Sequence, residues 1–325
     1  MSWGQSVALR RSVPQGITMY QVKRPSRGEF VRIRCLDYHV RVWGEPQADE
    51  APLVMVHGWM DVAASYQFMV DALARDRYII APDWRGYGLT ESGPVDNYWF
   101  PDYLADLDFL LDHYAGNQAV DLIGHSMGGN IAMLYAGVRP ERIRRLVNLE
   151  GFGMPVTKPS QAPGRYAKWM DELKKLHAGE MDLKAYDDVQ GVARRLMKTN
   201  ARLGQHKAEW LAQHWARANA QGKWEILGSA AHKISNAQLY RVDEVLEVYQ
   251  RITAPTLAVE ASDNSLDHWF DGKFTLEQYH ERLKQVANVR IERIEDAGHM
   301  MHHDQPEQLA RLIEAFLTPG SENGC

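Results

Sequence analysis

The stretch AVDLIGHSMGGNIAML, residues 119–134, decides the fold of this 325-residue chain. Residues 119–123 form a short apolar run typical of a buried strand, and residues 130–138 have the apolar spacing of a helix. Between them, Ser126 has a glycine two positions away on each side, although glycine costs backbone entropy and adds no side chain to a core. We therefore expect Ser126 to lie on a sharp turn between a strand and a helix.

The residue types around Ser126 indicate what this turn does. Gly124 to Gly128 match the pattern G-x-S-x-G, in which a strained turn holds the serine and neighbours with a Cβ would collide. Such a turn aims the Ser126 hydroxyl above the edge of the sheet, beside the backbone N–H of Met127 and the positive end of the helix dipole. These groups suit a nucleophile next to an oxyanion. Ser126 is the predicted nucleophile, and Met127 is a predicted oxyanion donor.

A serine hydroxyl is a weak nucleophile and needs a base. The candidate is His299 in the stretch EDAGHMMHHDQPE, residues 295–307, which follows the last predicted strand. A histidine in a glycine turn at this place fits the chain order of serine, acid and histidine. His302 and His303 do not predict a metal site with His299, because no second acid or cysteine cluster accompanies them. We expect no metal and no cofactor.

Composition narrows the class of protein. Hydrophobic residues make up 45% of the chain and charged residues 24%, which is ordinary for a globular protein. The net charge of −5 argues against a general nucleic-acid binder, and no apolar run approaches the length of about 20 residues that spans a membrane. The N-terminus lacks the apolar core of a secretory signal, and with only Cys35 and Cys325 a structural disulfide is not expected. These features predict a cytoplasmic monomer or homodimer that acts on a small molecule, without nucleic-acid or membrane partners.

Strands and helices alternate along most of the chain. An antiparallel hairpin is expected after residue 30, with its turn at Asp37, and six further strands alternate with helices. This rhythm predicts a mostly parallel, eight-stranded sheet with helices on both faces and the hairpin at one edge. The expected parts are an N-terminal arm (1–29), the core (30–151 and 251–318), an insertion (152–250) and a C-terminal tail (319–325).

The insertion after the sixth strand interrupts the alternation of strands and helices. Residues 152–250 contain no convincing strand, and several segments have helical spacing, so we expect an all-helical cap. Trp169, Trp210 and Trp215 lie on these predicted helices. An aromatic roof over the site would suit an apolar or aromatic substrate. The alternative is that these tryptophans only pack the cap onto the core.

Four motifs occur in order along the chain. They are VHGW (56–59), PDWRGYG (82–88), GHSMGG (124–129) and DAGHMMHHDQPE (296–307). With them, the chain resembles proteins of the α/β-hydrolase fold from about residue 30 to residue 318, and is most similar to small-molecule esterases, carbon–carbon hydrolases and serine-hydrolase-like proteins. The resemblance implies that the backbone N–H of Trp59 is the second oxyanion donor and that the Arg-Gly-x-Gly turn is structural.

The acid of the triad departs from this family's pattern. The usual acid comes three residues after a glycine at the end of the seventh strand, but here Ala261 replaces the glycine and the count leads to Asn264. Asp263, one residue earlier, is the preferred candidate, and Asp267 is a third choice. Some relatives, such as certain haloalkane dehalogenases, carry the acid after the sixth strand, where this chain has Glu150. The acid would hold the tautomer of the imidazole and stabilise the imidazolium.

Together these residues predict a serine hydrolase that forms an acyl-enzyme from a small, apolar or aromatic ester. Cleavage of a lactone or of a carbon–carbon bond stays open. Dehalogenases and epoxide hydrolases of this fold attack with aspartate, which Ser126 argues against. The alternatives are a cofactor-free dioxygenase, which needs only the histidine and an acid, and a signalling or binding protein without turnover. An activated serine would react with a fluorophosphonate probe, whereas a degenerate binding protein would not.

Overall fold

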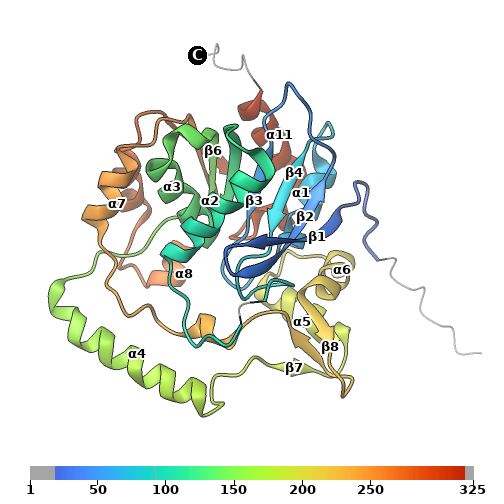
Figure 1. Ribbon diagram of the computed structural model, residues 1–325, viewed down its shortest axis with the longest axis vertical. Coiled ribbons are helices and arrows are strands. Elements are labelled where there is room, and N and C mark those ends of the chain that lie inside the picture. The colour runs from blue at the N-terminus through green and yellow to red at the C-terminus, as the bar shows by residue number, and fades with distance from the viewer. Residues whose placement is uncertain (1–18, 92, 319–325) are drawn as a thin grey trace, which may run out of the picture.

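The computed structural model describes residues 19–91 and 93–318, and its centre is an eight-stranded sheet (Figure 1). The strand order is β1-β2-β4-β3-β5-β6-β10-β11. Pairing is antiparallel from β1 to β2 and from β2 to β4, and parallel across the rest of the sheet. The strands are β1 (Arg27–Ile33), β2 (Leu36–Trp43), β3 (Leu53–Val56), β4 (Ile79–Pro82), β5 (Val120–His125), β6 (Ile143–Leu149), β10 (Thr256–Ala261) and β11 (Val289–Ile294). The predicted sheet is confirmed.

Helices cover both faces of the sheet, and each face has its own apolar core. One core packs the sheet against α2 (Pro101–Ala115), α3 (Met127–Val138), α7 (Val242–Tyr249) and α9 (Leu276–Leu283). The other packs it against α1 (Gln67–Ala72), α10 (Met301–Asp304) and α11 (Pro306–Leu317). Because β3, β4 and β5 are covered on both sides, all their residues are buried; β3 and β4 read as unbroken apolar runs, whereas β5 also contains the buried Asp121 and His125.

The hairpin lies at the edge of the sheet, as predicted, but its turn is at Arg34 and Cys35, not at Asp37. Arg34 adopts a left-handed conformation with φ 52°, which lets the chain reverse within two residues. Before the hairpin, residues 19–26 run along α1, where the backbone N–H of Arg24 and the hydroxyl of Tyr20 donate to the Asp71 carboxylate at 2.7 and 2.9 Å. Residues 1–18 of the predicted arm and the tail from residue 319 lie outside the described residues.

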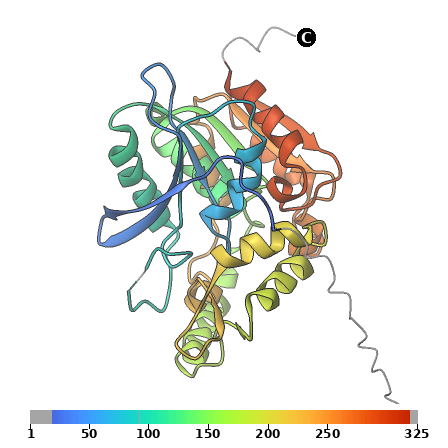
Figure 2. The same ribbon diagram turned by 90° about the vertical axis from the view of Figure 1, so that its right-hand side faces the viewer.

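Most of the insertion between β6 and β10 lies below the sheet in both ribbon views (Figure 1, Figure 2). It contains α4 (Ala162–His177), α5 (Val189–Thr199) and α6 (Gln205–Trp215). The prediction of an all-helical cap is wrong, because β7 (Ala185–Tyr186), β8 (Ala216–Ala218) and β9 (Trp224–Ile226) form a small antiparallel sheet. Strands of two or three residues are too short to show an alternating pattern in the sequence.

The last helix of the insertion, α7, packs against the core and not within the cap. A Cβ at Gly137 of α3 would lie 2.1 Å from the carbonyl oxygen of Val248 in α7, so only glycine permits this close approach. By contrast, α4 has no buried residue and stands away from the sheet (Figure 1). The cap therefore meets the core unevenly, because α7 and α6 pack against the core whereas no residue of α4 is buried.

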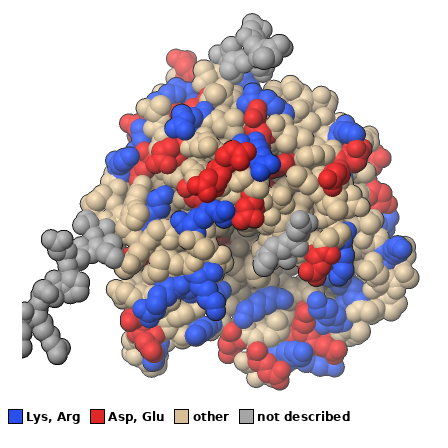
Figure 3. All heavy atoms as spheres, turned by 180° about the vertical axis from the view of Figure 1, so that it is seen from behind, with Lys and Arg blue, Asp and Glu red and all other residues tan. Residues whose placement is uncertain are grey.

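The outer surface carries charges of both signs. Basic and acidic side chains are interspersed over the face seen in Figure 3, which is the rear of the molecule relative to Figure 1. Among residues 19–91 and 93–318, no helix is both long enough and apolar enough to cross a membrane.

Candidate active site

Ser126 lies on the predicted turn between β5 and α3, with φ 53° and ψ −114°. A Cβ at Gly124 would lie 2.2 Å from the carbonyl oxygen of Gly128, and one at Gly128 would lie 2.2 Å from that of Val56. Both positions therefore require glycine. The N–H of Ser126 donates to the carbonyl of Leu149 at 2.8 Å, which fixes the turn to the neighbouring strand β6.

His299 follows β11 and faces Glu150, the residue after β6. The distance from His299 Nδ1 to Glu150 Oε2 is 2.7 Å, and the Glu150 side chain is completely buried. The hydroxyl of Ser265 donates to the same carboxylate oxygen at 3.1 Å and lies 3.1 Å from His299 Nδ1. The other oxygen of Glu150 accepts from the backbone N–H of Ala261 at 3.0 Å. A carboxylate held in this way fixes the imidazole with Nδ1 toward the acid and leaves Nε2 for a substrate or nucleophile.

The turn after β6 explains how Glu150 reaches this place. Glu150 adopts φ 51°, which swings its side chain across the end of the sheet. The Asn148 side chain secures the turn, because its Oδ1 accepts from the N–H of Gly151 at 2.9 Å and its Nδ2 donates to the carbonyl of Gly151 at 3.0 Å. The Tyr279 hydroxyl lies 3.1 Å from the same Nδ2. Asn148 is thus a positioning residue for Glu150.

The preference for Asp263 as the partner of His299 is wrong, and the alternative, Glu150, occupies that place. The Asp263 side chain is 71% exposed and accepts from Arg202 Nη1 at 3.1 Å. Its backbone N–H donates to the carbonyl of Ala297, which holds the loop with the carboxylate directed outward. Asp267 lies in α8 (Leu266–Phe270), and its side chain is outside the described part of the structure.

The two predicted oxyanion donors, Trp59 and Met127, line the same cavity as Ser126 and His299. Gly58 brings the first of these segments close to the nucleophile, since a Cβ there would lie 3.1 Å from the Cβ of Ser126. His125 anchors the other side, because its Nε2 donates to the carbonyl of His299 at 2.8 Å. The structure therefore brings together, at one cavity, the loop after β3, the turn that carries Ser126 and the loop that carries His299.

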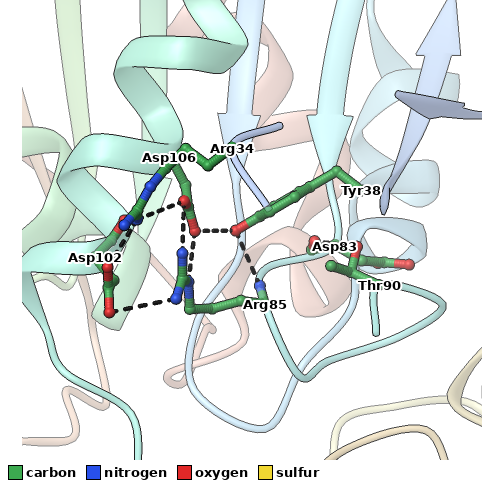
Figure 4. A network of polar contacts seen from close by, with 7 residues as sticks. All are labelled: Arg34, Tyr38, Asp83, Arg85, Thr90, Asp102 and Asp106. Atoms are coloured by element: carbon green, nitrogen blue, oxygen red, sulfur yellow. Dashed lines mark hydrogen bonds and ion pairs between the residues drawn. The ribbon is translucent and has the colours of Figure 1, made fainter. Parts of the chain in front are cut away.

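The PDWRGYG loop beside the site is held by a buried ionic network (Figure 4). Arg85 donates to both carboxylate oxygens of Asp106 at 2.6 and 2.7 Å, Arg34 donates to it at 3.0 Å, and the Tyr38 hydroxyl also donates to it. Asp83 accepts from the N–H groups of Ala63 and Leu89, at 2.8 and 3.0 Å. The residues of this network hold the loop and do not line the cavity, in agreement with a structural role.

A cavity of about 710 Å³ opens above Ser126. Its inner wall is apolar and comes from three helices of the core, with Leu104 of α2, Leu134 and Val138 of α3, and Val245, Val248 and Tyr249 of α7. The cap closes it with residues 230–241, where the imidazole of His232 stacks between Tyr87 and Tyr98, with both ring centroids 3.7 Å away. Burial lowers the pKa of His232 to about 3, so this ring is neutral and acts as part of the wall.

The prediction that Trp169, Trp210 and Trp215 form the roof is wrong. None of the three is among the lining residues, and the indoles that line the cavity are those of Trp59 and Trp269. Trp210 packs against Phe68 of α1 and Tyr20 of the arm, with ring centroids 5.6 and 6.1 Å away, and Trp215 joins the same apolar cluster. Helical spacing placed Trp210 and Trp215 on one apolar face of a helix. This face of α6 packs on the core and does not line the cavity.

Comparison with known proteins agrees with this architecture. Residues 51–306 match the family model of the alpha/beta hydrolase fold, and the chain belongs to this family. A serine hydrolase-like protein of Danio rerio is 25% identical over 86% of this chain and 85% of its own length. Esterase YbfF of Escherichia coli (strain K12) is 24% identical over 83% of this chain and 94% of its own length. The thioesterase domain from the curacin biosynthetic pathway superimposes with a TM-score of 0.76, covering 89% of this chain and 99% of that domain at 22% identity. The family and its relatives support a hydrolase.

Proposed function

We propose that this hydrolase is a serine hydrolase that cleaves an ester with a bulky apolar acyl group through Ser126, His299 and Glu150. The observation that carries the proposal is the joint position of the three residues. The buried Glu150 carboxylate lies 2.7 Å from His299 Nδ1, and Ser126 and His299 line one cavity. This is the arrangement of nucleophile, base and orienting acid that acyl transfer requires.

The proposed reaction has two halves. His299 Nε2 accepts the proton of the Ser126 hydroxyl while the serine oxygen bonds to the carbonyl carbon, and Glu150 stabilises the resulting imidazolium. The backbone N–H groups of Met127 and Trp59 receive the negative charge on the carbonyl oxygen. The imidazolium then protonates the departing alkoxide, leaving an acyl group on Ser126. A water molecule, deprotonated by His299, releases the acid and restores the serine.

The cavity supports the choice of an apolar acyl group. Its volume of about 710 Å³ lies in the range of small-molecule sites. The aliphatic side chains of Leu134 and Val138 on α3, and of Val245 and Val248 on α7, offer no hydrogen bond to a polar acyl chain. A longer apolar acyl group buries more surface here, at about 0.8 kcal/mol for each CH₂.

The test combines a probe, a variant and a substrate series. We expect a fluorophosphonate to label the native protein, and Ser126→Ala to abolish labelling and lower kcat by at least about 10³-fold, with the circular dichroism spectrum unchanged. Ser160→Ala, at an exposed position of the cap, is the matched control. A series of p-nitrophenyl esters should show kcat/KM increasing with acyl length.

Other results would point elsewhere. If Ser126→Ala kept full turnover and consumed dioxygen, the protein would be the cofactor-free dioxygenase considered above. If neither labelling nor turnover of esters, lactones or carbon–carbon substrates were found, the binding protein would stand. The cytoplasmic location, the monomeric or dimeric state and the lack of nucleic-acid and membrane partners stay predictions.

A further inference from the structure

Behind the nucleophile, three buried polar side chains converge from separate parts of the chain. They are Asp61 in the loop after β3, His125 at the end of β5, and His302 in α10. One ligand atom from each lies within 4.8 Å of the others, and His302 Nε2 is 3.9 Å from Asp61 Oδ2. All three residues are buried, with exposures of 4%, 2% and 0%.

Both histidine rings have nitrogens without a hydrogen-bond partner among the described protein groups. They are His125 Nδ1 and the two ring nitrogens of His302, whereas the Asp61 carboxylate has the Trp215 indole N–H as a donor besides Val62 and Ser65. Buried polar atoms are almost always paired with protein, water or an ion, because desolvation without a partner is unfavourable. Unpaired nitrogens on two buried rings beside a buried carboxylate indicate a site for a small ligand that bonds to all three side chains.

The surroundings determine the protonation of the ligands. His125 Nε2 lies 2.8 Å from the carbonyl oxygen of His299, and since a carbonyl only accepts, the proton is on Nε2. The neutral ring therefore presents the lone pair of Nδ1 to the cluster. Burial lowers the pKa of His125 and of His302 well below the ordinary value, so both rings are neutral near pH 7.

The carboxylate is also held in place. Asp61 Oδ1 accepts from the N–H of Val62 at 2.9 Å and from the Ser65 hydroxyl, which leaves Oδ2 directed at the two histidines. Burial raises the pKa of Asp61 to about 7, and the hydrogen bonds from Ser65, Val62 and Trp215 oppose the increase only in part. A cation beside Oδ2 would compensate the buried negative charge.

We propose that Asp61, His125 and His302 form a structural site for a divalent transition metal of the Zn²⁺ or Co²⁺ type. Two imidazole nitrogens and one carboxylate oxygen favour these ions over Ca²⁺ or Mg²⁺, which prefer oxygen ligands alone. Bonds of about 2.0–2.2 Å place the ligand atoms of a tetrahedron about 3.3–3.6 Å apart. His302 Nε2 and Asp61 Oδ2 are 3.9 Å apart and the three ligand atoms lie within 4.8 Å of one another, so side-chain shifts of about 1 Å achieve this geometry.

The environment of the ligands agrees with such a site. Ligating histidines usually donate their second ring nitrogen to a carbonyl or carboxylate, as His125 does to His299. The ion would join the loop before α1, the strand β5 that ends at His125 and the helix α10 after His299. The expectation of no metal came from His299, His302 and His303 alone, because Asp61 and His125 lie far from His302 in the sequence.

The test measures metal binding directly, without turnover. The full-length protein is freed of metal with a chelator, and Zn²⁺ or Co²⁺ is added both to the folded protein and during refolding. We expect one equivalent of metal to bind, the visible absorption of tetrahedral Co²⁺ to appear, and Tm to rise by about 5 °C or more at saturation. An anomalous-scattering peak between the three ligand atoms in crystals grown with Co²⁺ should locate the ion.

Variants decide whether the binding occurs at this site. Asp61→Asn keeps the shape of the side chain, and His302→Phe keeps the ring, and both should abolish the Co²⁺ absorption and the rise in Tm. His303→Phe is the matched control, because His303 is equally buried next to His302 but is not among the three ligands. The proposal is overturned if no stoichiometric metal binds, if both variants bind it like the native protein, or if the crystals show water at this point.

Discussion

The adjacent strands β6 and β10 are each followed by an acidic residue at the same edge of the sheet. One of these carboxylates is buried against His299, and the other is exposed to solvent. After β6, Glu150 takes a left-handed turn that Asn148 secures, and its carboxylate is buried against His299. After β10, the chain continues outward, and Asp263 is exposed and pairs with Arg202 of the cap. The loop after β10 contributes the Ser265 hydroxyl beside His299 instead of a carboxylate. The position of an acid at a strand end therefore does not define its role; the local turn does.

The largest effect that tests this comparison is expected from Glu150→Gln. Glutamine keeps the volume but removes the charge that stabilises the imidazolium and allows the wrong tautomer of His299. By analogy with acid-to-amide changes in other triads, kcat should fall by about 10³- to 10⁴-fold. The measurement is steady-state hydrolysis of the best ester, with thermal unfolding as a control for folding. Activity within tenfold of the native protein would remove Glu150 from the triad.

A transfer of the acid from one strand end to the other sharpens the comparison further. Ser265 Oγ lies 3.1 Å from His299 Nδ1, so a carboxylate at this position is within reach of the imidazole. In the double variant Glu150→Gln with Ser265→Asp, we expect kcat to recover by about tenfold or more over Glu150→Gln alone, because the charge on the imidazolium is again compensated. Ser265→Asn in the same background is the matched control and should give no recovery.

The comparison of the two acids also shows what the sequence could and could not predict. The sheet and its flanking helices were predictable because each element repeats its apolar period over several residues. The nucleophile turn was predictable because Gly124 and Gly128 are required at contacts of 2.2 Å. The sequence indicated Glu150 only as an alternative, because the usual family position lies in the loop after β10. Residues 148–151, Asn-Leu-Glu-Gly, nevertheless contain both the asparagine whose side chain bonds to the turn and the glycine that follows Glu150.

Other features had little or no signal in the sequence. Ser265 is one serine in a polar loop, and only the folded chain brings its hydroxyl to the carboxylate of Glu150. The strands of the cap are two or three residues long, so they leave no periodic pattern. The apolar face of α6 was correctly identified as a face, but periodicity does not say what a face packs against, and Trp210 and Trp215 pack on the core.

A smaller effect is expected when the Ser265 hydroxyl is removed. It donates one hydrogen bond to Glu150 Oε2, and a hydrogen bond to a charged group contributes about 1.5–3 kcal/mol. Because His299 and Ala261 still bind the carboxylate, Ser265→Ala should lower kcat by about tenfold while KM stays near the native value. Ser262→Ala, on the same loop but bonded to Ala297 instead of to the triad, is the matched control. A loss of stability without a change in kcat would mean that Ser265 only packs the loop.

The smallest effect is expected from Asp263→Asn, the substitution that would be most damaging if the usual family position held the acid. The Asp263 side chain is 71% exposed and accepts a hydrogen bond from Arg202, so the change weakens one surface ion pair between the cap and the core. Such pairs contribute about 0–1 kcal/mol, and kcat/KM should stay within about twofold of the native value. Any effect should appear in KM and should decrease at high salt, because screening weakens the same pair in the native protein. The comparison fails if Asp263→Asn lowers kcat by 10³-fold while Glu150→Gln remains active. That result would require the loop after β10 to reverse during catalysis and bring Asp263 to His299.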